Sequence, residues 1–159
     1  MGTHHEGTEK ETNSLNSFIK LVRAYESISS RLYMLFEKEN LTEIQFYLMD
    51  ALYHLGSLNQ KVISKKISRS EGNITMVVNN LEKRNLIKKK RNEVDKRIYN
   101  IELTREGAKL YEKIFPIFLK AIINEFDKLR RKEHKEFQKC CKKIGLNKLN
   151  PILPKEMGY

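Results

Sequence analysis

The sequence predicts a mainly α-helical fold with one small β-hairpin, which places it in the α+β class. Apolar residues recur at three- and four-residue steps over most of the chain, which is the periodicity of amphipathic helices. Between residues 99 and 103 the period changes to alternation, which indicates a half-buried strand. The 159 residues also carry a formal net charge of +11, which favours polyanionic partners such as nucleic acid.

The first segment is one long amphipathic helix. Its apolar stripe, from Leu15 to Phe36, predicts a helix over residues 14–38, and Asn40 marks its end. Residues 1–13 are polar, so we expect a disordered N-terminal arm with no apolar signal-peptide core. No apolar run approaches the roughly 20 residues that span a bilayer. We therefore expect a cytoplasmic protein without a membrane partner.

Three helices are predicted next. Thr42 can cap the first of them, with Gln45 at the capping-box position and Gly56 at its end. This helix is apolar on most sides and therefore belongs in the core. A short helix follows at 59–67, and a third helix is predicted over 70–84. The apolar stripe of the third helix is made of Ile74, Val77, Val78 and Leu81.

The β-hairpin comes after these helices. Residues 87–91 can pair with the alternating segment 99–103, and Asn92, Glu93 and Asp95 supply turn-forming side chains between them. The order of helix, short helix, turn, helix and hairpin over residues 41–103 predicts a winged helix-turn-helix.

The C-terminal part is helical again. Thr104 can cap a helix over 105–130, which would be about 39 Å long, and Pro116 should kink it. A final helix is predicted at about 133–145, and the tail 147–159 reads as irregular. Since helices of this length exceed what one small domain can bury, we expect 14–40 and 104–146 to form a dimerisation region.

The outer face of the helix at 70–84 suggests what the domain binds. The apolar stripe forces the opposite face outward, and this face carries short side chains rather than long charged ones. Short side chains allow a helix to lie deep in the major groove, where Asn and Thr can read base edges. Gly72 would permit close approach to phosphate at the helix N-terminus. An ordinary solvated polar face remains the alternative.

The hairpin strengthens this interpretation. Between residues 82 and 97, eight basic and three acidic residues leave a net charge of +5. A basic ribbon beside a groove-sized helix suits the phosphate backbone and minor groove, although lysines on an edge hairpin can also serve to prevent aggregation. In Asp95-Lys96-Arg97, the carboxylate could orient the guanidinium. The predicted DNA-binding residues are Ser70, Gly72, Asn73, Thr75, Met76, Asn79, Lys83, Lys89, Arg91, Lys96 and Arg97, with Asp95 orienting Arg97.

Two stretches resemble the MarR family of winged helix-turn-helix transcriptional regulators. Gly72 to Ile87 is similar to that family's recognition helix and first wing strand. Asp95-Lys96-Arg97, followed by residues 101–107, is similar to its wing signature and the entry to its fifth helix. The resemblance covers about 14–146. One departure is Asn85, where the family commonly has glycine; Asn tolerates the left-handed conformation better than most residues.

The resemblance implies a homodimer that places two lobes on adjacent major grooves of a pseudo-palindromic site, most often as a repressor. It implies that Arg97 enters the minor groove. It also implies release of DNA by a small phenolic or other amphipathic effector bound between the dimer region and the DNA-binding lobe. The candidate pocket residues are Tyr25, Tyr33, Phe36, Tyr47, Tyr53 and His54. Aromatic residues at helical spacing are also typical of an ordinary core.

Other features of the sequence favour alternative functions. The adjacent Cys140 and Cys141 lie among lysines, which lower a thiol pKa, so a thiol-based redox sensor is an alternative to buried structural cysteines. A nonspecific nucleic-acid-binding protein is another, and it would lack a preference of order a thousandfold for one palindrome. No metal site or other cofactor is expected from the scattered histidines. No enzymatic motif is evident.

Overall fold

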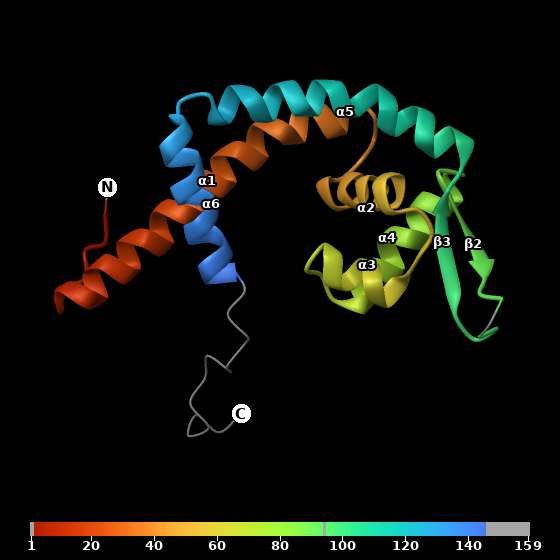
Figure 1. The fold of residues 1–159 in the computed structure, drawn as a ribbon, viewed down its shortest axis with the longest axis horizontal. Helices are drawn as coiled ribbons and strands as arrows, with labels where there is room; N and C mark the ends of the chain where they lie inside the picture. Colours follow the sequence, from red (N-terminus) through yellow and green to blue (C-terminus); the bar gives the residue numbers. More distant parts are fainter. Residues whose placement is uncertain (1, 94, 146–159) are drawn as a thin grey trace, which may run out of the picture. The chain divides into compact units, whose positions relative to one another are not determined.

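The structure is a computed structural model that describes residues 2–93 and 95–145. The chain forms two compact units, Met1–Ala121 and Ile122–Tyr159. In chain order the elements are α1 (Glu9–Glu37), α2 (Glu43–Leu55), β1 (Leu58–Asn59), α3 (Gln60–Lys66), α4 (Glu71–Lys83), β2 (Ile87–Arg91), β3 (Tyr99–Leu103), α5 (Arg105–Phe126) and α6 (Arg131–Gly145) (Figure 1). The mainly helical fold with a small sheet is therefore confirmed. No helix in the described ranges is both long and apolar enough to cross a membrane.

The N-terminal helix α1 begins earlier than predicted. Thr8 and Glu11 form a capping box, in which the backbone N–H of Thr8 donates to Glu11 Oε2 at 2.7 Å and that of Glu11 donates to Thr8 Oγ1 at 3.3 Å. The prediction of a disordered arm to residue 13 is therefore wrong for residues 9–13. Apolar periodicity missed this first turn because its residues are polar, whereas the Thr-x-x-Glu signature was available.

Helix α2 lies in the centre of the first unit, as its apolar composition predicts. Thr42 and Gln45 form the expected capping box, and Gly56 ends the helix with φ +75°. Phe46 is fully buried, and its ring contacts Phe36 of α1 and Phe118 of α5 at centroid distances of 4.9 and 4.7 Å. This aromatic cluster joins α1, α2 and α5 into one core.

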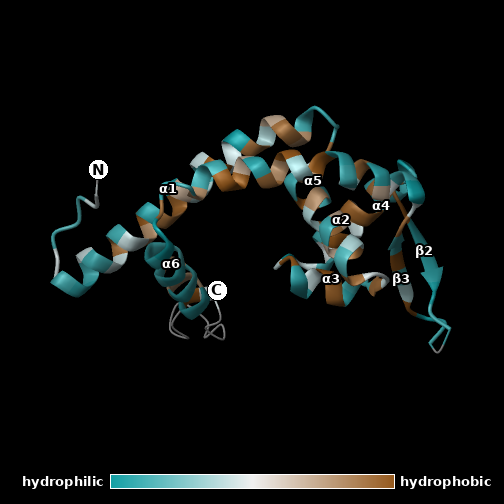
Figure 2. Cartoon of the chain, turned by 45° about the horizontal axis from the view of Figure 1, so that its top comes forward, coloured by the Kyte–Doolittle hydropathy of each residue, from teal (hydrophilic) through white to brown (hydrophobic). Residues whose placement is uncertain are grey.

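The sheet has three antiparallel strands in the order β1-β3-β2. Ile87 pairs with Leu103 and Arg91 with Tyr99, as the sequence predicts for the hairpin. The two-residue strand β1, which pairs Leu58 with Ile101, was not predicted because two residues are too short to show a period. Figure 2 shows the hydrophilic β2 beside the more hydrophobic β3.

Helix α4 is held by the predicted stripe, since Ile74, Val77, Val78 and Leu81 are all buried. Ser70 caps the helix, with its Oγ accepting from the backbone N–H of Asn73 at 3.4 Å. At the other end, the guanidinium of Arg84 donates to the backbone carbonyls of Glu39 and Asn40. These contacts fix both the rotation and the far end of α4.

Asn85 ends this segment in the left-handed region, with φ +56°, as expected for a position where glycine is common. We expect Asn85→Ala to lower the free energy of unfolding by about 1 kcal/mol. Alanine is strained in the left-handed conformation and lacks the short polar side chain that lets asparagine adopt it. Asn85→Gly should be close to neutral. Chemical denaturation of the three proteins measures the difference, and equal stability of the Ala and Gly variants would contradict this explanation.

The C-terminal helices differ from the prediction in their bounds. Helix α5 runs without interruption through Pro116 and ends at Phe126, so its 22 residues span about 33 Å rather than the 39 Å expected for 105–130. Within the second unit, Phe126 lies 6.2 Å from His134 and 5.9 Å from Phe137, measured between ring centroids. Helix α6 begins at Arg131, two residues before the predicted start. The tail 147–159 lies outside the described residues.

Candidate nucleic-acid interface

The outer face of α4 is open to solvent. Met76 is 59% exposed, and Thr75, Asn79 and Lys83 are exposed beside it. A methyl group added at Gly72 would meet nothing within 4 Å, so none of the described residues covers this position in the first turn of the helix. Asn73 is only half-buried rather than exposed, and its Oδ1 accepts no hydrogen bond from the part of the chain that the structure describes. The face therefore presents Thr75, Met76 and Asn79 outward, as predicted, whereas Asn73 is less exposed than predicted.

A residue that sequence reasoning missed contacts this face. The Gln60 side chain, at the start of α3, donates from Nε2 to Thr75 Oγ1 at 2.9 Å. Thr75 in turn donates to the carbonyl of Glu71 at 2.9 Å. The only proton of the Thr75 hydroxyl and one of its two acceptor positions are thus engaged within the protein, which leaves the methyl group and one acceptor position for an outside contact. No sequence signal links residues 60 and 75, because only the packing of α3 on α4 brings them together.

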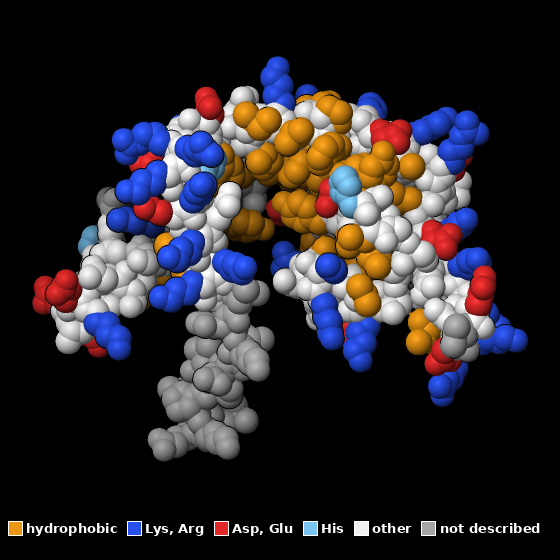
Figure 3. All heavy atoms as spheres, viewed as in Figure 1, with side chains coloured by type: hydrophobic (Ala, Val, Ile, Leu, Met, Phe, Trp, Pro, Cys, Tyr) orange, Lys and Arg blue, Asp and Glu red, His pale blue; other side chains and the backbone are white. Residues whose placement is uncertain are grey.

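The two strands of the wing carry a dense set of paired charges. Lys89 Nζ lies 2.7 Å from Glu82 Oε2 and 2.8 Å from Asn79 Oδ1. Arg91 donates from Nε to the Tyr99 hydroxyl at 3.2 Å, and its guanidinium carbon is 5.9 Å from the centre of that ring. Figure 3 shows basic and acidic side chains interspersed on the hairpin, at the right of the view. Lys89 and Arg91, both predicted to bind DNA, are therefore engaged within the protein.

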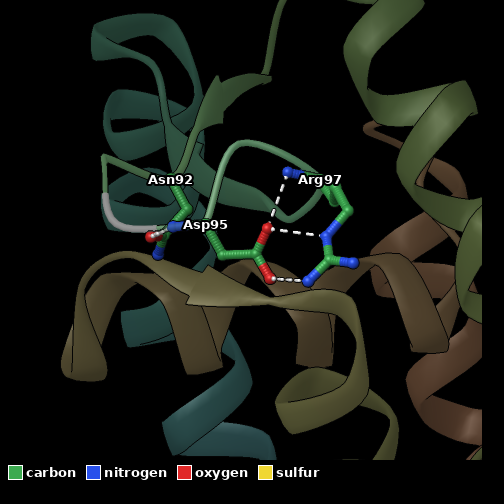
Figure 4. Close-up of polar contacts among 3 residues, drawn as sticks. All are labelled: Asn92, Asp95 and Arg97. Atoms are coloured by element: carbon green, nitrogen blue, oxygen red, sulfur yellow. Dashed lines mark hydrogen bonds and ion pairs between the residues drawn. The ribbon is translucent and has the colours of Figure 1, made fainter.

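The tip of the wing holds one arginine in a fixed orientation (Figure 4). Arg97 donates from Nε to Asp95 Oδ1 at 3.1 Å and from Nη2 to Oδ2 at 3.2 Å, while its backbone N–H donates to Oδ1 at 3.0 Å. The Asp95 N–H donates to the Asn92 side chain at 3.0 Å. Even so, the Arg97 side chain is 91% exposed. A largely exposed guanidinium is thus held by two hydrogen bonds to Asp95, and a third, from the Arg97 backbone N–H, fixes the position of that carboxylate.

The charge state of this pair follows from the same contacts. The side-chain hydrogen bonds from Arg97, and then the one from its backbone, hold the pKa of Asp95 below its ordinary value. The carboxylate therefore stays ionised well below neutral pH and continues to accept from the guanidinium. Lys96, between the two residues, is exposed.

The six predicted pocket residues do not gather in one cavity. Tyr25, Tyr33 and the buried Phe36 line a concavity of about 390 Å³ between α1 and α2. Tyr47 and His54 line another, of about 470 Å³, between α2 and the segment 66–68 after α3. Tyr53 faces a third, near Glu102 and Leu103. The core alternative holds for Phe36, which is 1% exposed.

A polar cluster lies at the edge of the second concavity. The buried Tyr111 donates its hydroxyl proton to Asp50 Oδ1 at 2.6 Å, and the Tyr111 hydroxyl oxygen lies 3.0 Å from His54 Nε2. Burial, and then the hydrogen bond to Asp50, raise the pKa of Tyr111, so the phenol stays protonated. Asp50 and Tyr111 were not predicted, because their pairing depends on the packing of α5 on α2.

The cysteines lie on α6. Cys140 is exposed and Cys141 half-buried, so the expectation that they are buried structural residues is wrong for this chain. Within the described ranges, no three histidine, cysteine, aspartate or glutamate side chains lie close enough together to hold a metal ion.

Comparison with known proteins identifies the family. The model of the MarR family matches residues 41–99. The HTH-type transcriptional regulator MhqR of Bacillus subtilis is 34% identical over 140 residues, which cover 88% of this chain and 94% of that protein.

Solved structures agree. MepR of S. aureus in complex with DNA is 25% identical, with a TM-score of 0.73 over 80% of this chain and 94% of that one. BpsR of Bordetella bronchiseptica, whose DNA binding is regulated by 6-hydroxynicotinic acid, is 22% identical, with a TM-score of 0.74 over 81% and 98%. MhqR matches this chain along nearly the whole MhqR length, and the family model matches residues 41–99. This chain, which has a winged helix fold, therefore belongs to the MarR family of transcriptional regulators.

Proposed function

We propose that this chain is a sequence-specific DNA-binding regulator that acts as a homodimer, most simply as a repressor, on a pseudo-palindromic operator. The observation that carries the proposal is the pairing of two surfaces. The open, small-residue face of α4 is fixed by a buried stripe, and the wing tip presents an exposed Arg97 held by Asp95. In this proposal α4 reads the major groove and Arg97 enters the adjacent minor groove.

Exposed apolar side chains support the homodimer. In α1, Phe18 is 65% exposed, Leu21 43% and Tyr25 52%, and in α6 Ile144 is 61% exposed. In the second unit an apolar concavity of about 490 Å³ is lined by Ile122, Phe126 and Phe137 among others. Exposure of apolar side chains of this size to water is unfavourable, so a second copy of the chain that covers them is the economical explanation.

A small aromatic effector is the third part of the proposal. The concavity beside Tyr47 combines apolar walls with Asp50 and His54, which suits a ring that carries hydroxyl or carboxyl groups. BpsR, which shares the fold, is regulated by such a molecule. Titration of phenolic and hydroxylated aromatic acids into the protein–operator complex tests this part, and release by none of them would contradict it.

Selection of bound DNA from a random pool tests the central claim. We expect enrichment of two inverted half-sites whose centres are about one helical turn apart, because a twofold dimer places two α4 helices in successive major grooves. A nonspecific nucleic-acid-binding protein would enrich no such site, and its affinity would vary little with sequence. Asymmetric enriched sites would contradict the dimer geometry alone.

Arg97→Ala should weaken operator binding by about 10- to 100-fold, because it removes the group proposed to enter the minor groove. The loss should be largest on operators whose flanks are A-tracts, since their narrow minor groove attracts arginine most strongly. Fluorescence anisotropy on A-tract and GC-rich flanks measures both effects.

The matched control is Asp95→Ala, which keeps the charge of Arg97 but removes the carboxylate that orients it. We expect a smaller loss for this variant on both kinds of flank. Equal affinities of wild type and Arg97→Ala on A-tract flanks would show that the tip does not enter the groove.

A further inference from the structure

One lysine of the wing is turned toward α4 instead of solvent. Lys89, in the middle of β2, has a side chain that is 29% exposed, against 60% for Lys88 and 59% for Lys90. Its ammonium group lies between Glu82 Oε2 at 2.7 Å and Asn79 Oδ1 at 2.8 Å. An ammonium that is already held by a carboxylate and an amide oxygen is poorly placed to neutralise a DNA phosphate.

This contact also fixes the orientation of the Asn79 amide. A lysine ammonium can only donate hydrogen bonds, so the atom of Asn79 that faces it must be the amide oxygen. The amide nitrogen, with two N–H donors, is then on the other side of the group, and Asn79 is exposed on the outer face of α4. An asparagine in this state presents donors outward and keeps its acceptor turned toward the wing.

Adenine and guanine present different hydrogen-bond donors and acceptors to such an amide in the major groove. Adenine pairs with asparagine through an N7 acceptor and an N6 donor, so both the amide nitrogen and the amide oxygen are needed. Guanine presents two acceptors, N7 and O6, to which two N–H groups can donate. An amide whose oxygen is engaged therefore matches guanine better than adenine.

On the basis of the proposed DNA-binding function, we propose that Glu82 and Lys89 position Asn79 as a hydrogen-bond donor that selects guanine over adenine at one base pair of each half-site. In this arrangement Asn79 touches the base. Lys89 is a positioning residue and not a phosphate contact, and Glu82 holds Lys89 in place through the ion pair.

The variant Lys89→Met separates positioning from phosphate binding, since methionine keeps most of the side-chain length without the charge. We expect the guanine preference at the Asn79 base pair to fall by about tenfold while the dependence of affinity on salt stays the same. A lysine bound to phosphate would behave in the opposite way, because its loss reduces the salt slope by about 0.9 per contact. Operator variants that differ at one base pair, titrated at several salt concentrations, give both quantities.

Three further variants complete the test. Lys88→Met, on the same strand but paired with Glu102, should leave the guanine preference unchanged. Asn79→Ala should abolish the preference at the same base pair. Glu82→Gln should weaken the preference and make the salt dependence steeper, because the freed lysine becomes available to phosphate. Circular dichroism melting curves confirm that each variant is folded.

The outcomes separate this inference from the function on which it rests. If wild-type protein enriches no palindromic site, both fail. If it enriches one, but Lys89→Met lowers the salt slope and leaves every base preference intact, then Lys89 is a phosphate contact and only the positioning role is overturned. An Asn79→Ala variant with the wild-type base preference likewise overturns the assignment of Asn79 as the reader.

Discussion

Gly107→Ala is expected to lower the free energy of unfolding by about 3 kcal/mol, at the upper end of what overpacking costs. A methyl group added at this position would lie 1.9 Å from the carbonyl oxygen of Leu86 and 2.9 Å from its carbonyl carbon. That carbonyl also accepts a hydrogen bond from the Thr104 backbone N–H at 3.1 Å. Since the clash is with backbone that holds the start of α5, no side-chain rotation can relieve it.

Urea denaturation at one fixed protein concentration measures this loss, because the stability of a dimer depends on concentration. Gly72→Ala is the matched control, since nothing lies within 4 Å of the added methyl group there. Alanine inside a helix is favoured over glycine, so the control should be neutral or more stable by up to about 1 kcal/mol. A Gly107→Ala variant within about 0.5 kcal/mol of wild type would mean that the two backbones separate at little cost.

The parts of this fold that could be predicted are those set by neighbours in sequence. The burial of Ile74, Val77, Val78 and Leu81 follows from their spacing, because a helix brings residues three and four apart onto one face. The caps at Thr42 and Ser70 and the left-handed Asn85 are equally local. The outward face of α4 followed from this stripe without any knowledge of tertiary structure.

What could not be predicted depends on partners that are distant in sequence. Strand β1 exists only because β3 lies beside it. The two strands are distant in sequence, since Asn59 pairs with Asn100, 41 residues later. The engagement of Thr75 by Gln60 and of Asn79 by Lys89 likewise needs the packing of α3 and β2 against α4. For this reason the apolar stripe predicts that Thr75, Met76 and Asn79 face outward, but nothing in the sequence distinguishes Lys89 from the other basic residues of the wing.

The predicted pocket residues fail to converge for a related reason. Aromatic residues spaced three or four apart share a helix face, but nothing in that spacing says which neighbouring element covers each of them. Tyr33 is 58% exposed on α1, whereas Phe36, three residues later, is 1% exposed against α2 and α5. The polar pair Asp50 and Tyr111 carried no sequence signal, since the two residues lie on separate helices.

The largest loss of stability is expected for Phe46→Ala, at about 3–5 kcal/mol, the usual cost of truncating a fully buried phenylalanine. The Phe46 ring is 0% exposed and contacts four aromatic rings, at centroid distances of 4.9 Å to Phe36, 4.7 Å to Phe118, 5.7 Å to Tyr111 and 5.9 Å to Tyr47. Removal of the ring leaves a cavity where α1, α2 and α5 meet, and rigid helices cannot close it.

Phe46→Leu is the control, since it keeps most of the apolar volume and should cost about 1.5 kcal/mol or less. Thermal and urea unfolding at equal protein concentration compare the two variants with wild type. Because α1 and α5 belong to the proposed dimerisation region and α2 packs against the DNA-binding helices, a loosened Phe46 site should also weaken operator binding under conditions where the protein remains folded. If Phe46→Ala were no less stable than Phe46→Leu, the three-helix junction would have to be held by something other than this aromatic cluster, and the packing that fixes α2 beneath α1 and α5 would need another explanation.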